Sequence, residues 1–194
     1  MAATHPILDD LLFDTPDNSV RRLVGERREA ELAITYWEQE AIRLGYPPTL
    51  TTFNNAEMSS EKWAYRFILS VDPIGSRKRV SEGRPIAENW LFLFCGDKLA
   101  ALLNLPKSRN ISVIQQLPAR FLPVFTKGCY DAISLGCYDA ISLGVPVCMQ
   151  GAVEGEDGRQ ELYRAVFIGL RVRPHGLMHL VFGAFNCRVK HSQA

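Results

Sequence analysis

The pattern of apolar positions changes from a helical to a strand period near residue 46, and the change marks the first two elements. Apolar residues recur three and four positions apart through residues 20–44, with Arg27 as the one charged residue in the stripe. Gly45 and the prolines at positions 47 and 48 end such a helix, because glycine caps helix C-termini and proline cannot continue them. The spacing predicts a long helix over residues 19–45, preceded by a tail over residues 1–18.

The apolar stripe of this helix has two possible partners. A 3-4 repeat sustained over the whole helix is typical of a coiled-coil seam, which would make the protein a homodimer. A helix that lies on the sheet of its own chain carries a similar stripe, and Arg27 with two alanines weakens the seam. Both interpretations stay open, and we expect a homodimer through the N-terminal helix and the sheet.

Five stretches after the prolines have the pattern of strands. From Trp63 to Asp72 the odd positions are apolar or aromatic, which predicts a strand with one buried face. A second strand is expected near residues 89–95, and three more over residues 147–153, 162–172 and 177–189. The turns at 154–158 and 173–176 are rich in glycine and polar residues, so the last three strands read as two hairpins.

Helices are predicted between the second and third of these strands. A short helix over residues 98–103 follows Gly96-Asp97, and residues 110–116 form a connector. Pro118 opens a longer helical region that ends with Gly144 and Pro146. Runs of strands separated by a run of helices indicate an α+β fold with an antiparallel sheet.

An eight-residue repeat lies inside the longer helical region. The segment 128–135 (copy one) is repeated without change as 136–143 (copy two). A helix continuous through both copies would be about 12 Å longer than with one, so both copies cannot occupy the same environment. We expect copy two to keep the ancestral packing, because a short link ties it to the next strand. The competing outcome is a helix that ends at Gly136.

Composition and charge place the chain in a broad class. Lysine and arginine number 22 against 21 acidic residues, a balance that argues against a nucleic-acid-binding surface. No apolar run approaches the length of about 20 residues that spans a membrane, and the N-terminus lacks the pattern of a signal peptide. Five cysteines without paired spacing favour free thiols in a reducing compartment. We therefore expect a cytoplasmic protein with no membrane or nucleic-acid partner.

The candidate chemistry is sparse. No phosphate-binding glycine loop or nucleophile elbow is present. His175 and His179 have the spacing of zinc ligands but fall on a turn and a strand, so we expect no metal site. Arg164 shares the apolar face of its predicted strand, where it needs an ion-pair partner or an anionic ligand because its guanidinium stays charged. His179 shares an apolar face in the same way, and no residue is predicted to be catalytic.

Six segments carry a resemblance to a known family: Tyr36-Trp37 with Pro47-Pro48, residues 63–69, residues 95–103, residues 143–146, residues 161–164 and Gly183-Ala184. They resemble bacterial stand-alone PAS-domain proteins that carry an N-terminal helix. This resemblance implies a PAS-like five-stranded antiparallel sheet with helices on one face and a pocket between them, over residues 46–194. It also implies sensing of small molecules or partners, and dimerisation through the N-terminal helix and the sheet.

The combined reading is a cytoplasmic PAS-type sensory or regulatory protein that acts by binding a small ligand or a signalling protein, without catalysis. The expected ligand-binding residues are Tyr65, Trp90, Arg164 and His179, and the sequence identifies no cofactor. The alternative is a small cone-fold α+β enzyme of the ketosteroid-isomerase or polyketide-cyclase type. That fold begins with helices and has no helix run between its second and third strands, so the topology discriminates between the two.

Overall fold

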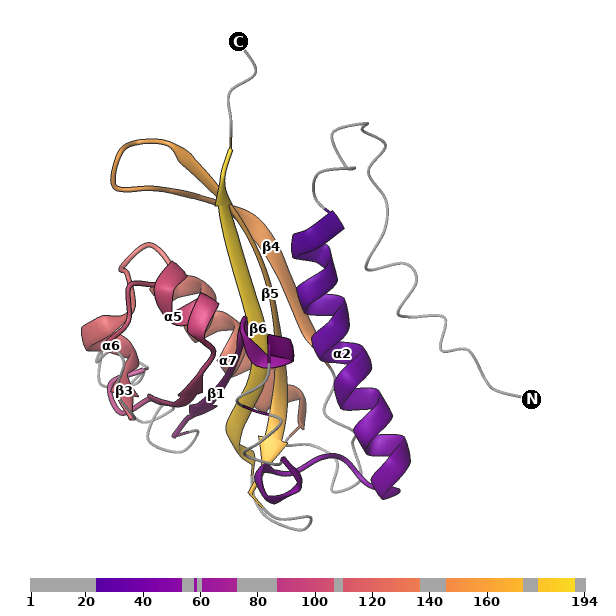
Figure 1. Cartoon of the computed structure of the whole chain (residues 1–194). Helices are drawn as coiled ribbons and strands as arrows, with labels where there is room; N and C mark the ends of the chain where they lie inside the picture. The colour runs from indigo at the N-terminus through magenta and orange to yellow at the C-terminus, as the bar shows by residue number, and fades with distance from the viewer. Residues whose placement is uncertain are drawn as a thin grey trace.

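The computed structural model describes residues 24–53, 58, 61–72, 87–106, 110–136, 146–172 and 178–190. Figure 1 shows the arrangement of its helices and strands. In chain order these are α2 (Val24–Leu44), η2 (Leu50–Thr52), η3 (Glu61–Trp63), β1 (Arg66–Ser70), β2 (Leu91–Cys95), α5 (Asp97–Leu102), β3 (Ile111–Ser112), α6 (Val113–Gln116), α7 (Leu122–Gly136), β4 (Val147–Glu154), β5 (Gln160–Arg171) and β6 (Met178–Val189).

One antiparallel sheet organises the chain. It has six strands in the order β3-β2-β1-β6-β5-β4, and the predicted β4–β5 and β5–β6 hairpins are confirmed. The prediction of five strands is wrong by one, because Ile111 and Ser112 pair with β2 at the sheet edge. This strand has two residues, too few for an alternating pattern to appear in the sequence.

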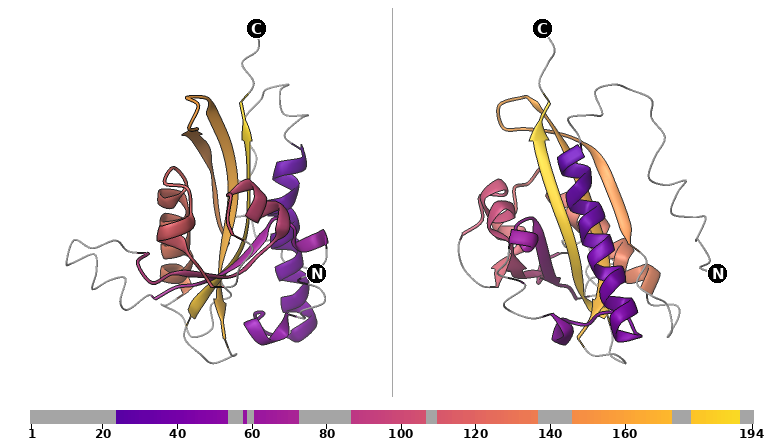
Figure 2. Two further views of the ribbon diagram at one scale, coloured as in Figure 1. Left: turned by 60° about the vertical axis from the view of Figure 1, so that its left-hand side comes forward. Right: turned by 45° about the vertical axis from the view of Figure 1, so that its right-hand side comes forward.

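Helices lie on both faces of the sheet: the helix run between β2 and β4 lies on one face, and the separately predicted N-terminal helix α2 lies on the other. Helix α7 packs against β4, β5 and β6 on one side, and α2 packs against β5 and β6 on the other (Figure 2). The core therefore forms two layers. The helix-run layer lies between the sheet and α5–α7 and is built around Phe67, Phe125 and Phe167. The α2 layer lies between the sheet and α2 and is built around Trp37, Trp63 and Phe182.

Because helices lie on both faces of the sheet, both faces of β1 are buried. Consecutive residues Arg66, Phe67, Ile68 and Leu69 are all buried, although the alternation predicted only one buried face. The odd residues lie in the helix-run layer, and Ile68 lies in the α2 layer. Trp63 comes before the strand, in the turn η3, where it is 1% exposed. A strand with both faces covered needs no polar face, so alternation alone cannot identify it.

The apolar stripe of α2 faces the sheet of the same chain. Ala33, Ile34 and Trp37 are buried in the α2 layer, which realises the second of the two interpretations of the stripe. The helix ends as predicted at Gly45, which has a φ of +72° and donates its N–H to the carbonyl of Ala41. Side chains committed to the sheet cannot form a coiled-coil seam at the same time. The homodimer stays a prediction, and residues 1–23 lie outside the described residues.

The longer helix begins later than predicted. Helix α7 starts at Leu122 instead of Pro118 and is described as far as Gly136. Copy one of the repeat packs in the core, where Gly128, Cys129, Ala132 and Ile133 are buried. Copy one therefore contributes to the core. The expectation that copy two keeps the ancestral packing concerns residues 137–143, which lie outside the described residues.

Candidate functional site

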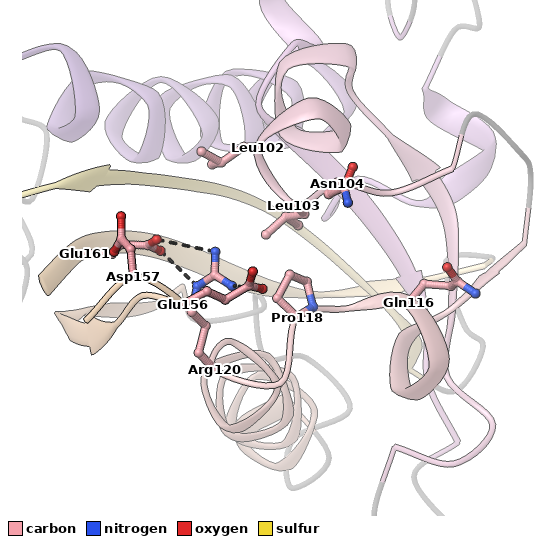
Figure 3. Close-up of a pocket in the computed structure, with 9 residues that line it drawn as sticks. All are labelled: Leu102, Leu103, Asn104, Gln116, Pro118, Arg120, Glu156, Asp157 and Glu161. Carbon is pink, nitrogen blue, oxygen red and sulfur yellow. Dashed lines mark hydrogen bonds and ion pairs between the residues drawn. The ribbon is translucent and has the colours of Figure 1, made fainter. Parts of the chain in front are cut away.

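A polar groove opens at one end of the helix-run layer. It has a volume of about 540 Å³ and lies between the end of α5, the segment around α6 and the β4–β5 turn (Figure 3). Its lining consists of Leu102, Leu103, Asn104, Gln116, Pro118, Arg120, Glu156, Asp157 and Glu161. Three segments far apart in the sequence thus contribute to one concave surface.

An arginine held by two carboxylates occupies the groove. The Arg120 Nε donates to Glu161 Oε2 at 3.0 Å, and its Nη1 donates to Glu156 Oε1 at 3.4 Å (Figure 3). The guanidinium also lies over the ring of Phe121, with its carbon 4.7 Å from the ring centre. The Cys187 thiol donates to Glu161 Oε2 at 3.6 Å. These contacts fix the arginine and Glu161 in one orientation, since charge-assisted hydrogen bonds are strong when partly shielded from water.

Local sequence places each partner of this ion pair. Arg120 precedes Phe121, which is 1% exposed and packs edge-on against Phe185 of β6. Glu161 lies at the start of β5, just after a turn closed by a hydrogen bond from Gly158 N to Gly155 O. Gly158 has a φ of +75°, a conformation that glycine adopts without strain. The buried phenylalanine and the turn bring the arginine and the carboxylate together across the groove.

The groove is suited to holding a polar or cationic group. One arginine faces three carboxylates, those of Glu156, Asp157 and Glu161, so the lining carries excess negative charge. Arg159 pairs with Asp157 and reduces that excess. Within the part of the chain that the structure describes, no cluster of His, Cys, Asp and Glu has the geometry of a metal site. His175 lies outside those residues, so its pairing with His179 is not described.

The carboxylate of Glu161 is expected to contribute more to stability than that of Glu156. Its side chain is 16% exposed and that of Glu156 is 92% exposed, although both bind Arg120. Glu161→Gln should lower the free energy of unfolding by about 1 kcal/mol, because a half-buried guanidinium loses its closest charge partner. The matched control Glu156→Gln should cost less than about 0.5 kcal/mol. Urea denaturation measures both values, and equal losses would contradict the prediction.

The four residues predicted to bind a ligand do not line a common cavity. Trp90 is 1% exposed in the helix-run layer, whereas Arg164 of β5 is on the same face as Val166, in the α2 layer. His179 is half-buried, and its carbonyl accepts from Val71 N at 2.8 Å. Tyr65 is half-buried in the turn before β1, with Lys98 Nζ 5.6 Å from its ring centre. Both faces of the sheet are covered by helices, so a residue on an apolar face of its strand can lie in either layer. The apolar pattern therefore did not bring these four residues together.

The sequence did not point to the Arg120–Glu161 ion pair or to the buried Arg66. Arg120 and Glu161 are 41 positions apart, and no motif connects them. Arg66 is on the even face of its strand, which the alternation marked as polar, yet it is 3% exposed. The apolar residue at the next even position, Ile68, was the one available signal that this face is also covered.

The cysteines of the described residues are free thiols, and burial changes their acidity. Burial raises the pKa of the Cys95 thiol to about 12, with a smaller contribution from the charge of Asp97. Burial also raises the pKa of Cys129, in copy one. Cysteine in an unfolded chain ionises near pH 8.5. Above that pH the unfolded state loses a proton that the folded state keeps, so the free energy of unfolding should fall as the pH rises toward 12.

The expected result is a shallower loss of stability in Cys95→Ser, since serine does not ionise in this range. Urea denaturation at about pH 8 and about pH 10 measures the difference. Cys148→Ser is the comparison, because it keeps the Cys95 and Cys129 thiols in place. Burial also raises the pKa of Cys148, so this variant should change the pH dependence, but less than Cys95→Ser does. The same pH dependence in wild type and in Cys95→Ser would contradict the assignment of the effect to Cys95.

The fold and the groove define an α+β domain with one antiparallel sheet between two helical layers. No protein-family model matches the sequence, and no curated protein matches it. Among solved structures, the chain is similar to the PAS domain of an HTR-like protein from Haloarcula marismortui, with 12% identity and a TM-score of 0.33. The alignment covers 84% of this chain and 98% of that domain. At these values the likeness assigns no ligand, partner or activity.

Within the described ranges, no helix is both long and apolar enough to cross a membrane.

Proposed function

We propose that this chain is a PAS-type sensory or regulatory domain that works by binding, without catalysis, in the cytoplasm. The observation that carries the proposal is the order of elements: two strands, a run of helices, then three strands, in a single antiparallel sheet. This is the order implied by the resemblance at residues 63–69 and 95–103. The two-residue strand β3 extends the sheet edge without changing the order of the five longer strands.

The helix run also argues against the cone-fold enzyme. That fold has no helices between its second and third strands, whereas α5, α6 and α7 lie between β2 and β4. An isomerase or cyclase needs an acid or base free to exchange protons with a substrate. The groove instead holds an arginine whose guanidinium is bound by two carboxylates. Such a lining favours binding of a polar ligand over proton transfer.

Signal output would pass through the sheet to α2. Helix α7 begins directly after the groove residue Arg120 and packs on β5, while α2 packs on the opposite face of β5 and β6. A ligand that favours one position of α7 would therefore favour one arrangement of the α2 layer, by its differential affinity for the two states. The readers of that change would be a second copy of the chain or a signalling protein.

Native mass spectrometry of the purified protein tests the binding role. We expect the native mass to exceed the denatured mass by that of a retained small molecule, or a screened ligand to slow hydrogen exchange in α2 and α7. Light scattering of Ile42→Glu tests the partner, because Ile42 is an apolar residue of α2 that is 82% exposed. A change from dimer to folded monomer would support a dimer through α2, and an unchanged oligomeric state would contradict it. A protein that retains and binds nothing would overturn the binding role.

A further inference from the structure

Arg66 is a buried cation with incomplete hydrogen bonding. It begins β1 and is 3% exposed, on the face that α2 covers. Its Nη2 donates to the carbonyl oxygen of Leu32 in α2 at 3.3 Å. Its Nε and Nη1 are buried and have no hydrogen-bond partner in the structure. Two of the three nitrogens of this guanidinium therefore lack an acceptor.

Aromatic rings compensate only part of this burial. The Arg66 guanidinium carbon lies 4.6 Å from the ring centre of Tyr36 and 5.5 Å from that of Trp63. Ring faces attract a cation, typically by about 0.5–2 kcal/mol. The N–H bonds of a guanidinium point outward in its own plane, so they need acceptors at its edge. A buried charge without them is costly, and arginine cannot escape that cost by losing its proton.

The carboxylate of Glu29 in α2 does not supply the missing hydrogen-bond acceptor. Glu29 is half-buried about one turn before Leu32 and attracts the Arg66 charge, which opposes the lowering of the arginine pKa by burial. No ion pair or hydrogen bond joins the two side chains in the described structure. The α2 layer thus holds a fixed positive charge, an aromatic wall and unused donors at a single place.

We propose that Arg66 is the receptor for the carboxylate of a small aromatic or apolar acid, bound beneath α2. This inference rests on the proposed binding function and adds to the groove a second binding position, beneath α2. A carboxylate carries one negative charge, which matches the single charge of Arg66 and accepts from its free N–H groups. The rings of Tyr36 and Trp63 favour an apolar body on the ligand. Because Arg66 is buried, a ligand reaches it only when α2 shifts on the sheet, so occupancy and helix position are coupled.

Thermal unfolding with benzoate tests the proposal. At constant ionic strength, benzoate should raise the Tm of the wild type saturably, by about 5 °C at roughly a hundredfold excess over its Kd. Acetate should act more weakly because it lacks the apolar body, and chloride should have no saturable effect. The rise should disappear in Arg66→Gln and persist in Arg43→Gln, the same change at an exposed arginine of α2 outside the groove. Hydrogen exchange should show altered protection of residues 31–37 and 66–70 in the wild type.

Each other outcome has a defined meaning. No saturable rise, an equal rise in Arg66→Gln, or a rise with inorganic phosphate and not with benzoate would overturn the proposal. If Arg66→Gln does not fold, the wild-type exchange experiment decides, because unchanged protection at residues 31–37 would refute binding beneath α2. If Glu29→Gln lowers the Tm as much as Arg66→Gln and benzoate has no effect, Glu29 is the counter-ion. A retained ligand found by native mass spectrometry together with no benzoate effect would contradict this inference and leave the proposed function standing.

Discussion

Replacing Trp63 with alanine is expected to lower the free energy of unfolding by about 4 kcal/mol, because the change empties the centre of the α2 layer. Trp63 is 1% exposed. Its ring packs against those of Tyr36, Phe53, Phe94 and Phe182 at centroid distances of 5.2–5.8 Å. The loss combines the transfer free energy of the indole with a cavity that rigid neighbouring rings cannot close. Urea denaturation followed by circular dichroism measures it.

The matched control is Trp63→Phe, which keeps an aromatic ring in the same position. It should cost about 1–2 kcal/mol, since the remaining cavity is smaller. Because domains of this size are stable by about 5–15 kcal/mol, both variants should remain measurable at low temperature. A loss below about 1 kcal/mol in Trp63→Ala would mean that α2 does not pack on the sheet in solution as described.

Gly128→Val is expected to cost about 3 kcal/mol, the upper part of the range for overpacking a core. A Cβ atom at Gly128 would lie 2.3 Å from two ring atoms of Phe167, so the ring or the helix must move. Phe167 is fully buried and packs against the rings of Phe67 and Phe125, which leaves the ring no space. Guanidinium denaturation measures the loss, which includes the separation of α7 from β5.

The repeat offers an unusual control for this change. Gly136 has the same seven following residues in copy two that Gly128 has in copy one. If copy one alone holds the core position, Gly136→Val should lower the free energy of unfolding less than Gly128→Val does. Equal losses for the two variants would show that the copies share the core position, and a larger loss at Gly136 would show that copy two occupies it.

Local signals in the sequence were sufficient for most elements. The end of α2 follows from Gly45 and the prolines after it, whose backbone preferences act without help from distant residues. The β4–β5 and β5–β6 hairpins follow from turn residues between apolar runs for the same reason. These features depend on neighbours in the chain, so the chain alone is enough to predict them.

The candidate site could not be found in this way. The partners Arg120 and Glu161 meet only because the helix run folds back over the sheet. Arg66 was read as a polar-face residue, and its burial follows from α2 packing on β5 and β6, which brings Leu32 to Arg66. Arg164 and Trp90 share an apolar signal but lie in different layers, which no periodicity distinguishes.

The sequence by itself determined the number and order of the longer strands, the helix run between them and the presence of an exact repeat. The tertiary structure decided which face each helix covers, that copy one of the repeat packs in the core, and which arginines are shielded from water. The physical reason is the range of the forces involved. Backbone preferences and capping act over a few residues, whereas the burial of a charge or an apolar face depends on which distant segment covers it.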